Sequence, residues 1–177
     1  NENIRNLLIN SGLWNAFRSR PFNRTPSIDS SPNAIFINAC DTNPLAVDPY
    51  FIIKEGLKYF NRGLKALYEN FSCPIHCCYQ NSDFDLSVDG INYHQFSGPH
   101  PSGLTSTHIN KIYPVNLKRI AWTIGYQDII SIGYLLEHNS LRTHKLIALA
   151  GPSVFNPSLI KARISGNIDE LTAGKLE

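Results

Sequence analysis

The chain has 177 residues, of which 42% are apolar and only 17% charged, against about 25% charged in an average soluble domain. Its formal net charge of +2 is too small to indicate a nucleic-acid surface, which normally carries a clustered basic face. No stretch approaches the roughly 18 consecutive apolar residues that a membrane span needs, and the polar N-terminus shows no secretory signal. We therefore expect one soluble, cytosolic domain.

The two ends of the sequence indicate a domain taken from a longer protein. The chain contains no methionine and opens directly on a helical pattern. It closes on Leu176 and Glu177, a pair that is typical of a cloning scar.

Short apolar runs alternate with amphipathic helical patterns along the chain. Strands covered on both faces read as continuous apolar stretches, and helices show apolar residues three and four positions apart. The predicted strands are residues 34–37, 72–79, 91–96, 119–124 and 146–150. The predicted helices are residues 4–12, 49–69 and 126–137, and long loops are predicted at 15–33 and 97–110.

This order of elements predicts an α/β domain with a mostly parallel sheet. The domain is expected to span residues 1–152, with residues 153–177 as a C-terminal extension that leads to a following module. Ligands of such sheets bind at the carboxyl ends of the strands. We therefore look for a site in the loops that follow Ile37, Phe96, Ile124 and Ala150.

The four cysteines and a group of histidines are the candidate metal ligands. Cys40, Cys73, Cys77 and Cys78 lack the paired spacing of zinc sites, and the adjacent Cys77 and Cys78 point to opposite faces of a strand. We interpret the cysteines as packing residues in preference to metal ligands. The histidines lie close together in sequence in a loop region without helical metal-ligand spacing, and they either stabilise the loop or contact a ligand; they are His94, His100 and His108.

Two further groups of residues have competing interpretations. Gln127 and Asp128 are expected in the first turn of the helix over 126–137, where a carboxylate can cap free N–H groups, with Tyr126 and Trp122 packed in the core. Together with Trp122, Thr123 and Tyr126 they alternatively form an aromatic-lined pocket for a planar ligand. The arginines of the first long loop form either a solvated face or a contact with an anionic ligand or partner; they are Arg18, Arg20 and Arg24. Nucleotide-binding glycine motifs and a nucleophilic serine elbow are absent from the sequence.

Segments spread over about 150 residues resemble the A-subunit family of Na+-translocating NADH:quinone oxidoreductases. No single motif decides the resemblance, which rests on the order and spacing of many. They include Ser11-Gly12-Leu13-Trp14, Asp41-Thr42-Asn43-Pro44-Leu45-Ala46, Ser97-Gly98-Pro99-His100-Pro101, Tyr113-Pro114-Val115, Tyr126-Gln127-Asp128-Ile129-Ile130 and Leu149-Ala150-Gly151-Pro152.

The resemblance implies a Rossmann-like α/β domain related to the flavin-binding subunit of complex I and to the C subunit of the Rnf complex. In those relatives a glycine-rich stretch after the first helix cradles the phosphate of FMN. Here that stretch is Trp14–Phe22, whose large side chains would fill the space that glycines leave for a phosphate. We therefore expect no bound flavin and no NADH oxidation by this domain.

The resemblance also implies a function as part of a respiratory Na+ pump that couples NADH oxidation and ubiquinone reduction to Na+ export. The domain is expected to lie peripherally on the cytoplasmic face of the bacterial inner membrane and to dock other subunits of that complex. Two alternatives stay open, a ubiquinone-binding site and a flavin- or nicotinamide-binding enzyme. The candidate quinone cleft consists of Phe96, His100, His108, Trp122 and Tyr126, because a planar ring with two carbonyls needs aromatic walls and a few donors.

Overall fold

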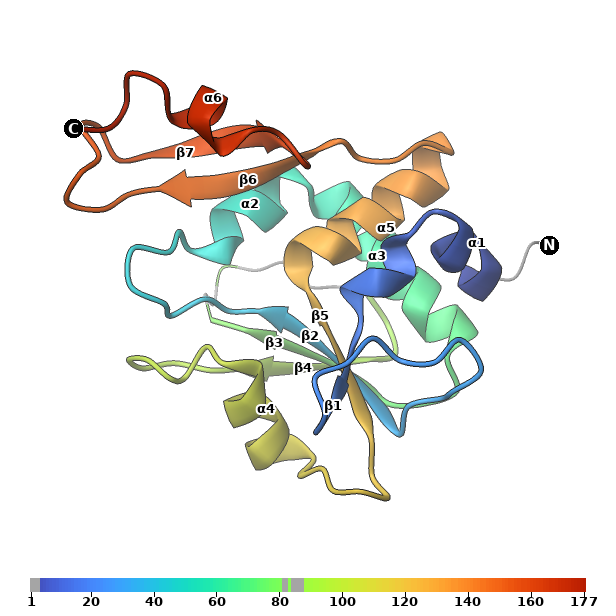
Figure 1. The fold of residues 1–177 in the computed structure, drawn as a ribbon. Helices are drawn as coiled ribbons and strands as arrows, with labels where there is room; N and C mark the ends of the chain where they lie inside the picture. The colour runs from blue at the N-terminus through green and yellow to red at the C-terminus, as the bar shows by residue number, and fades with distance from the viewer. Residues whose placement is uncertain (1–3, 81–82, 84–87) are drawn as a thin grey trace.

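The computed structural model describes residues 4–80, 83 and 88–177, which form a five-stranded sheet with helices on both faces and a separate two-stranded sheet (Figure 1). The strand order of the large sheet is β1-β5-β2-β3-β4, in which β5, β2, β3 and β4 are parallel and β1 is an antiparallel edge strand. The predicted α/β class with a mostly parallel sheet is confirmed. The strands are β1 Arg18–Arg20, β2 Ala34–Ala39, β3 Ile75–Tyr79, β4 Ile91–Gln95, β5 Ala121–Gly125, β6 His144–Leu149 and β7 Ser158–Arg163.

Alternation along the central strands separates two core clusters. Ile35 and Ile37 of β2 face a main cluster, in which the sheet packs against α1, α2, α3 and α5, whereas Phe36 faces a second cluster beneath α4. The helices are α1 Ile4–Asn10, η1 Leu13–Ala16 (a 3-10 turn), α2 Pro49–Glu55, α3 Leu57–Asn70, α4 Thr105–Ile112, α5 Tyr126–His138 and α6 Ile168–Thr172. Among the described residues, no helix has the length and apolar character to cross a membrane.

Three sequence predictions need correction. The helix expected over 49–69 is two helices that meet at Gly56, a residue with low helix propensity. The loop expected over 15–33 contains the end of η1 and the whole of β1, and β1 is too short and polar to show an apolar run. The loop expected over 97–110 ends in α4, whose mostly polar sequence TSTHINKI buries His108 and Ile109 and so offers few apolar residues to mark a helix.

The strand expected over 146–150 is also different from its prediction. It is β6, which does not join the large sheet but pairs antiparallel with β7, and its Ile147 is 38% exposed. The apolar residues of β6 therefore lie over the helices and are not part of a central strand of the large sheet. The predicted domain boundary at residue 152 falls between these two paired strands.

A close backbone contact joins α3 and α5. A Cβ added at Gly133 of α5 would lie 1.8 Å from the backbone oxygen of Tyr59, and one added at Gly63 of α3 would lie 2.4 Å from the backbone oxygen of Ile129. Both glycines are buried. The two helix backbones therefore approach each other to a distance that only glycine permits.

Gly133→Ala should lower the free energy of unfolding by about 2–4 kcal/mol, because the methyl group must push α5 away from a backbone carbonyl. The measurement is urea unfolding followed by circular dichroism. Gly125→Ala is the matched control, since its Cβ would meet nothing closer than 3.5 Å; it should change the free energy by less than about 1 kcal/mol. Equal effects of the two substitutions would contradict this description of the helix contact.

Candidate functional site

A cavity of about 340 Å³ lies at the carboxyl ends of β2 and β5. The chain leaves β2 toward β3 on one side, whereas β5 lies on the other, so this is the point where the strand order reverses. Open α/β sheets bind their ligands at such a point. The cavity is lined by Ala16, Arg18, Arg20, Asn38, Cys40, Asp41, Asn43, Gly103, Leu104, Thr105, Ser106, Thr123, Ile124, Gly125 and Tyr126.

Side-chain hydrogen bonds fix the loop after β2 against the segment before α4. The Asn38 amide donates to the Gly103 carbonyl at 3.1 Å, and its oxygen accepts from the backbone N–H of Cys40 at 3.0 Å. The hydroxyl of Thr42 accepts from the backbone N–H of Gly103 at 3.0 Å. A Cβ at Gly103 would lie 2.7 Å from the Thr42 nitrogen, so the two segments meet at glycine distance. These contacts hold the two segments against each other along one wall of the cavity.

The cavity walls include the N-terminal ends of two helices. α4 begins after Leu104 and α5 after Gly125, and neither residue provides a side-chain hydrogen bond to the first helical amides. The unpaired N–H groups of a helix start carry partial positive charge. The cavity therefore offers backbone donors to an electron-rich atom such as a carbonyl oxygen.

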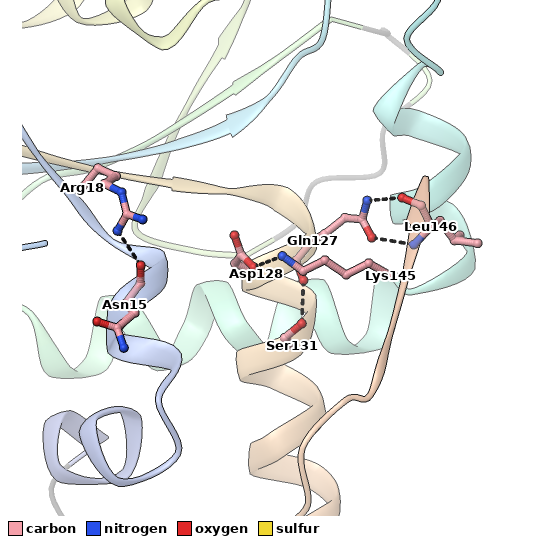
Figure 2. Close-up of polar contacts among 7 residues, drawn as sticks. All are labelled: Asn15, Arg18, Gln127, Asp128, Ser131, Lys145 and Leu146. Carbon is pink, nitrogen blue, oxygen red and sulfur yellow. Dashed lines mark hydrogen bonds and ion pairs between the residues drawn. The ribbon is translucent and has the colours of Figure 1, made fainter. Parts of the chain in front are cut away.

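The two arginines of β1 contribute differently. Arg18 donates to the backbone carbonyl of Asn15 at 2.5 Å (Figure 2) and to the hydroxyl of Thr25 at 3.1 Å, so its guanidinium is occupied within the N-terminal segment. The Nε of Arg20 is buried and has no hydrogen-bond partner in the described part of the chain. Arg20 is therefore the available cationic donor at this site.

Two titratable groups at the cavity, the Cys40 thiol and the Tyr126 hydroxyl, are held neutral. Burial, together with the nearby Asp48 and Asp41, raises the pKa of the Cys40 thiol to about 12. Burial also raises the pKa of the Tyr126 hydroxyl. A buried thiol with a raised pKa is not a nucleophile at neutral pH. The arrangement favours binding of a ligand through hydrogen bonds over covalent catalysis.

The structure does not bring the five residues of the predicted quinone cleft together. Tyr126 lines the cavity, and His100 lies in an exposed loop with its Nδ1 3.3 Å from the Thr42 hydroxyl. Phe96 packs against His108 of α4, with ring centroids 4.1 Å apart, and both side chains are buried. Trp122 is on the opposite face of the sheet, where it is 1% exposed in the main cluster. Of the five, only Tyr126 and His100 therefore have access to the loops at the carboxyl edge.

The candidate metal ligands, the histidines and the cysteines, do not lie together in one cluster either. His94 does not meet His100 or His108 in a cluster; its Nε2 lies 3.0 Å from Nδ1 of His76, and burial together with His94 lowers the pKa of His76 to about 4. Among the described residues, no group of three His, Cys, Asp or Glu side chains is placed to hold a metal ion. The cysteines are free, and Cys77 and Cys78 face different core clusters, which confirms their opposite orientation.

Comparison with known proteins places this arrangement in a family. The family description "NqrA second alpha/beta domain" matches residues 1–141. The chain belongs to this family. It is 46% identical over 178 residues to the A-subunit of the Na(+)-translocating NADH-quinone reductase of Serratia proteamaculans, 45% to that of Neisseria meningitidis serogroup B, and 44% over 180 residues to that of Actinobacillus pleuropneumoniae. In each case the match covers 99% of this chain but 40% of the relative, so the chain spans about two fifths of their length.

In this NqrA-type domain, two side chains at the start of α5 form a clamp, by which we mean that they bond β6 of the two-stranded sheet. They do not form the predicted helix cap. Gln127 donates to the backbone carbonyl of Leu146 at 2.7 Å and accepts from its N–H at 3.0 Å (Figure 2). Asp128 forms an ion pair with Lys145 at 2.5 Å. The sequence places Gln127 and Asp128 near the helix start, but their partners lie 19 and 17 residues away, beyond the reach of a local capping rule.

Gln127→Ala should release β6 from α5, because it removes both hydrogen bonds to Leu146. The free energy of opening of the β6 amides is expected to fall by about 1–3 kcal/mol, measured by native-state hydrogen exchange. The matched control is Gln95→Ala, whose exposed side chain donates to the Gln80 carbonyl and does not contact β6 in the described part of the chain. Unchanged exchange across β6 would show that the clamp does not hold the two-stranded sheet.

Proposed function

We propose that the chain is the second α/β domain of the A-subunit of a Na+-translocating NADH-quinone reductase, and that it docks other subunits without carrying flavin. Membership of the NqrA second alpha/beta domain family and the A-subunit names of the relatives support this proposal. The domain would then lie peripherally on the cytoplasmic face of the membrane complex, whose NADH, quinone and Na+ chemistry takes place in the assembled enzyme.

The absence of flavin is supported by the segment at the position of the glycine-rich FMN loop. Trp14 and Phe17 are buried, and their rings lie 5.3 and 5.7 Å from that of Trp122. The segment continues directly into β1, which pairs with β5. Side chains and a strand therefore occupy the region in which an FMN-binding loop would leave its backbone open to phosphate.

The distribution of exposed apolar side chains supports the proposed docking role. Seven of the thirteen large hydrophobic residues that are exposed in the described part of the chain lie within residues 141–177. That segment contains β6, β7 and α6. Contiguous exposed apolar surface marks sites of protein contact. The seven residues are Leu141, Ile147, Phe155, Leu159, Ile164, Ile168 and Leu176.

Replacing both Phe155 and Ile168 by serine should reduce co-purification of the complete subunit with the rest of the complex at least tenfold. The two side chains are 57% and 71% exposed, so their loss removes interface contacts worth about 1.4 kcal/mol or more without disturbing the core. The measurement is pull-down of the tagged subunit from membranes, quantified against the wild-type protein.

Leu117→Ser is the control, because Leu117 is 78% exposed but lies outside residues 141–177. It should leave co-purification unchanged, and all variants should keep the wild-type Tm. Equal assembly of the double variant and the wild-type protein would contradict docking through this C-terminal surface.

A second candidate function is binding of a quinone headgroup, and the cavity at β2 and β5 favours it. Its volume of about 340 Å³ is in the range of small-ligand sites. Ile124 and Leu104 supply apolar wall, while Tyr126, Arg20 and the start of α4 supply donors for carbonyl oxygens. This site retains Tyr126 of the sequence-predicted cleft.

Titration of the isotope-labelled chain with a short-chain ubiquinone should give saturable NMR shifts at Tyr126 and at residues 103–106, which line the cavity. Tyr126→Phe should weaken binding about five- to tenfold through loss of one hydrogen bond. His100→Ala, outside the cavity lining, should have no effect. Non-saturating shifts, or shifts centred on Phe96 and His108, would contradict this site.

A further inference from the structure

A second cavity, of about 230 Å³, lies between the helical layer and the two-stranded sheet, on the far side of the clamp formed by Gln127. Figure 1 shows β6 and β7 extending over α2 and α5, the elements that enclose it. Its lining residues are Ile52, Glu55, Gly56, Tyr59, Ile130, Tyr134, Arg142, Thr143, His144, Leu146 and Lys161. The proposed docking and quinone functions do not use this cavity.

The cavity collects basic side chains from neighbouring positions of the two-stranded sheet. Arg142 lies two residues before His144, the first residue of β6. Lys161 of β7 is the register partner of Leu146, which also lines the cavity. Glu55 is the one carboxylate among the lining residues. With His144 neutral, the lining therefore carries an excess of positive charge.

One nitrogen of the half-buried Arg142 side chain lacks a partner among the described residues. Its Nη1 is buried without a hydrogen-bond partner in the described part of the chain, and Arg142 forms no ion pair with any described residue. Burial outweighs the distant attraction of Glu55 and Asp128 and lowers the pKa of Arg142. Because an unpaired buried charge is strongly unfavourable, such a group normally meets a counter-charge.

Two tyrosines add an aromatic part to the otherwise mostly aliphatic remainder of the lining. The rings of Tyr59 and Tyr134 lie 5.2 Å apart in an edge-to-face arrangement. The hydroxyl of Tyr59 is engaged by Nε2 of His138 at 2.9 Å, so the tyrosine that can turn its hydroxyl to a ligand is Tyr134. The site thus combines the guanidinium of Arg142, which can form two parallel hydrogen bonds, the ammonium of Lys161 and the rings of Tyr59 and Tyr134.

We propose that this cavity binds the phosphate group of a small phosphorylated molecule. A guanidinium binds phosphate oxygens bidentately, and an ammonium adds a point charge. A phosphate group carries more negative charge and more acceptor oxygens than a carboxylate, so it matches the cationic donors Arg142 and Lys161 and the nearby His144 better. The volume is below the usual range for drug-sized ligands, which indicates a phosphate with a small organic part.

The test is an NMR titration of the isotope-labelled 177-residue chain with inorganic phosphate, compared with sodium chloride at matched ionic strength. Saturable shifts of the Thr143, His144 and Lys161 amides, seen with phosphate and not with chloride, are the expected result. Arg142→Gln should weaken phosphate binding at least tenfold, because it removes a charged donor pair. Lys118→Gln removes an exposed charge away from this cavity and should leave binding unchanged.

Lys161→Gln provides a second variant that does not depend on a buried residue, since Lys161 is exposed. It should weaken phosphate binding about threefold while the spectrum keeps its wild-type dispersion. Linear, chloride-like shifts in the wild-type chain would overturn the proposal. The proposal would also be overturned if the Lys161→Gln protein kept wild-type phosphate affinity while the Lys118→Gln protein lost affinity for phosphate.

Discussion

The packing of three aromatic rings around Trp122 is the interaction on which the rest of the structure depends. Trp14, Phe17 and Phe71 surround it at 5.3–5.9 Å, and the guanidinium of Arg5 lies 5.1 Å from the Trp14 ring. This cluster fixes η1 and β1 against β5, and β1 in turn positions Arg20 at the main cavity. The same contacts that build the core therefore also shape the cavity at β2 and β5.

The α/β class was predictable from the sequence because buried parallel strands leave a strong local signal. Ala34–Ala39 and Ala121–Gly125 are nearly all buried, and their mainly apolar sequences are interrupted by few polar residues, such as Asn38 and Thr123. Arg18–Arg20 and Thr105–Ile112 left no such signal, since one pairs through its backbone at the sheet edge and the other buries two side chains. His144–Leu149 gave the opposite error. Its apolar run resembles that of a buried sheet strand, but its residues lie over helices or face solvent.

The candidate site was predictable only in its place at the carboxyl edge of the sheet. Strand ends are local features, so the loops after Ile37 and Ile124 could be named in advance, and both contribute to the cavity. Which side chains meet there depends on the face that each strand residue takes and on long-range pairings. Trp122 packs into the opposite face of the sheet, and Gln127 bonds a strand 19 residues away. Neither contact has a sequence signature.

The measurement that tests the central claim most directly is equilibrium dialysis of the purified chain against FMN, followed by its visible absorption spectrum. If Trp14, Phe17 and β1 replace the phosphate-binding loop, the chain stays colourless and FMN distributes equally across the dialysis membrane. Stoichiometric retention of FMN with a flavin absorption band would contradict the account. It would show that these buried aromatic residues do not prevent FMN from binding.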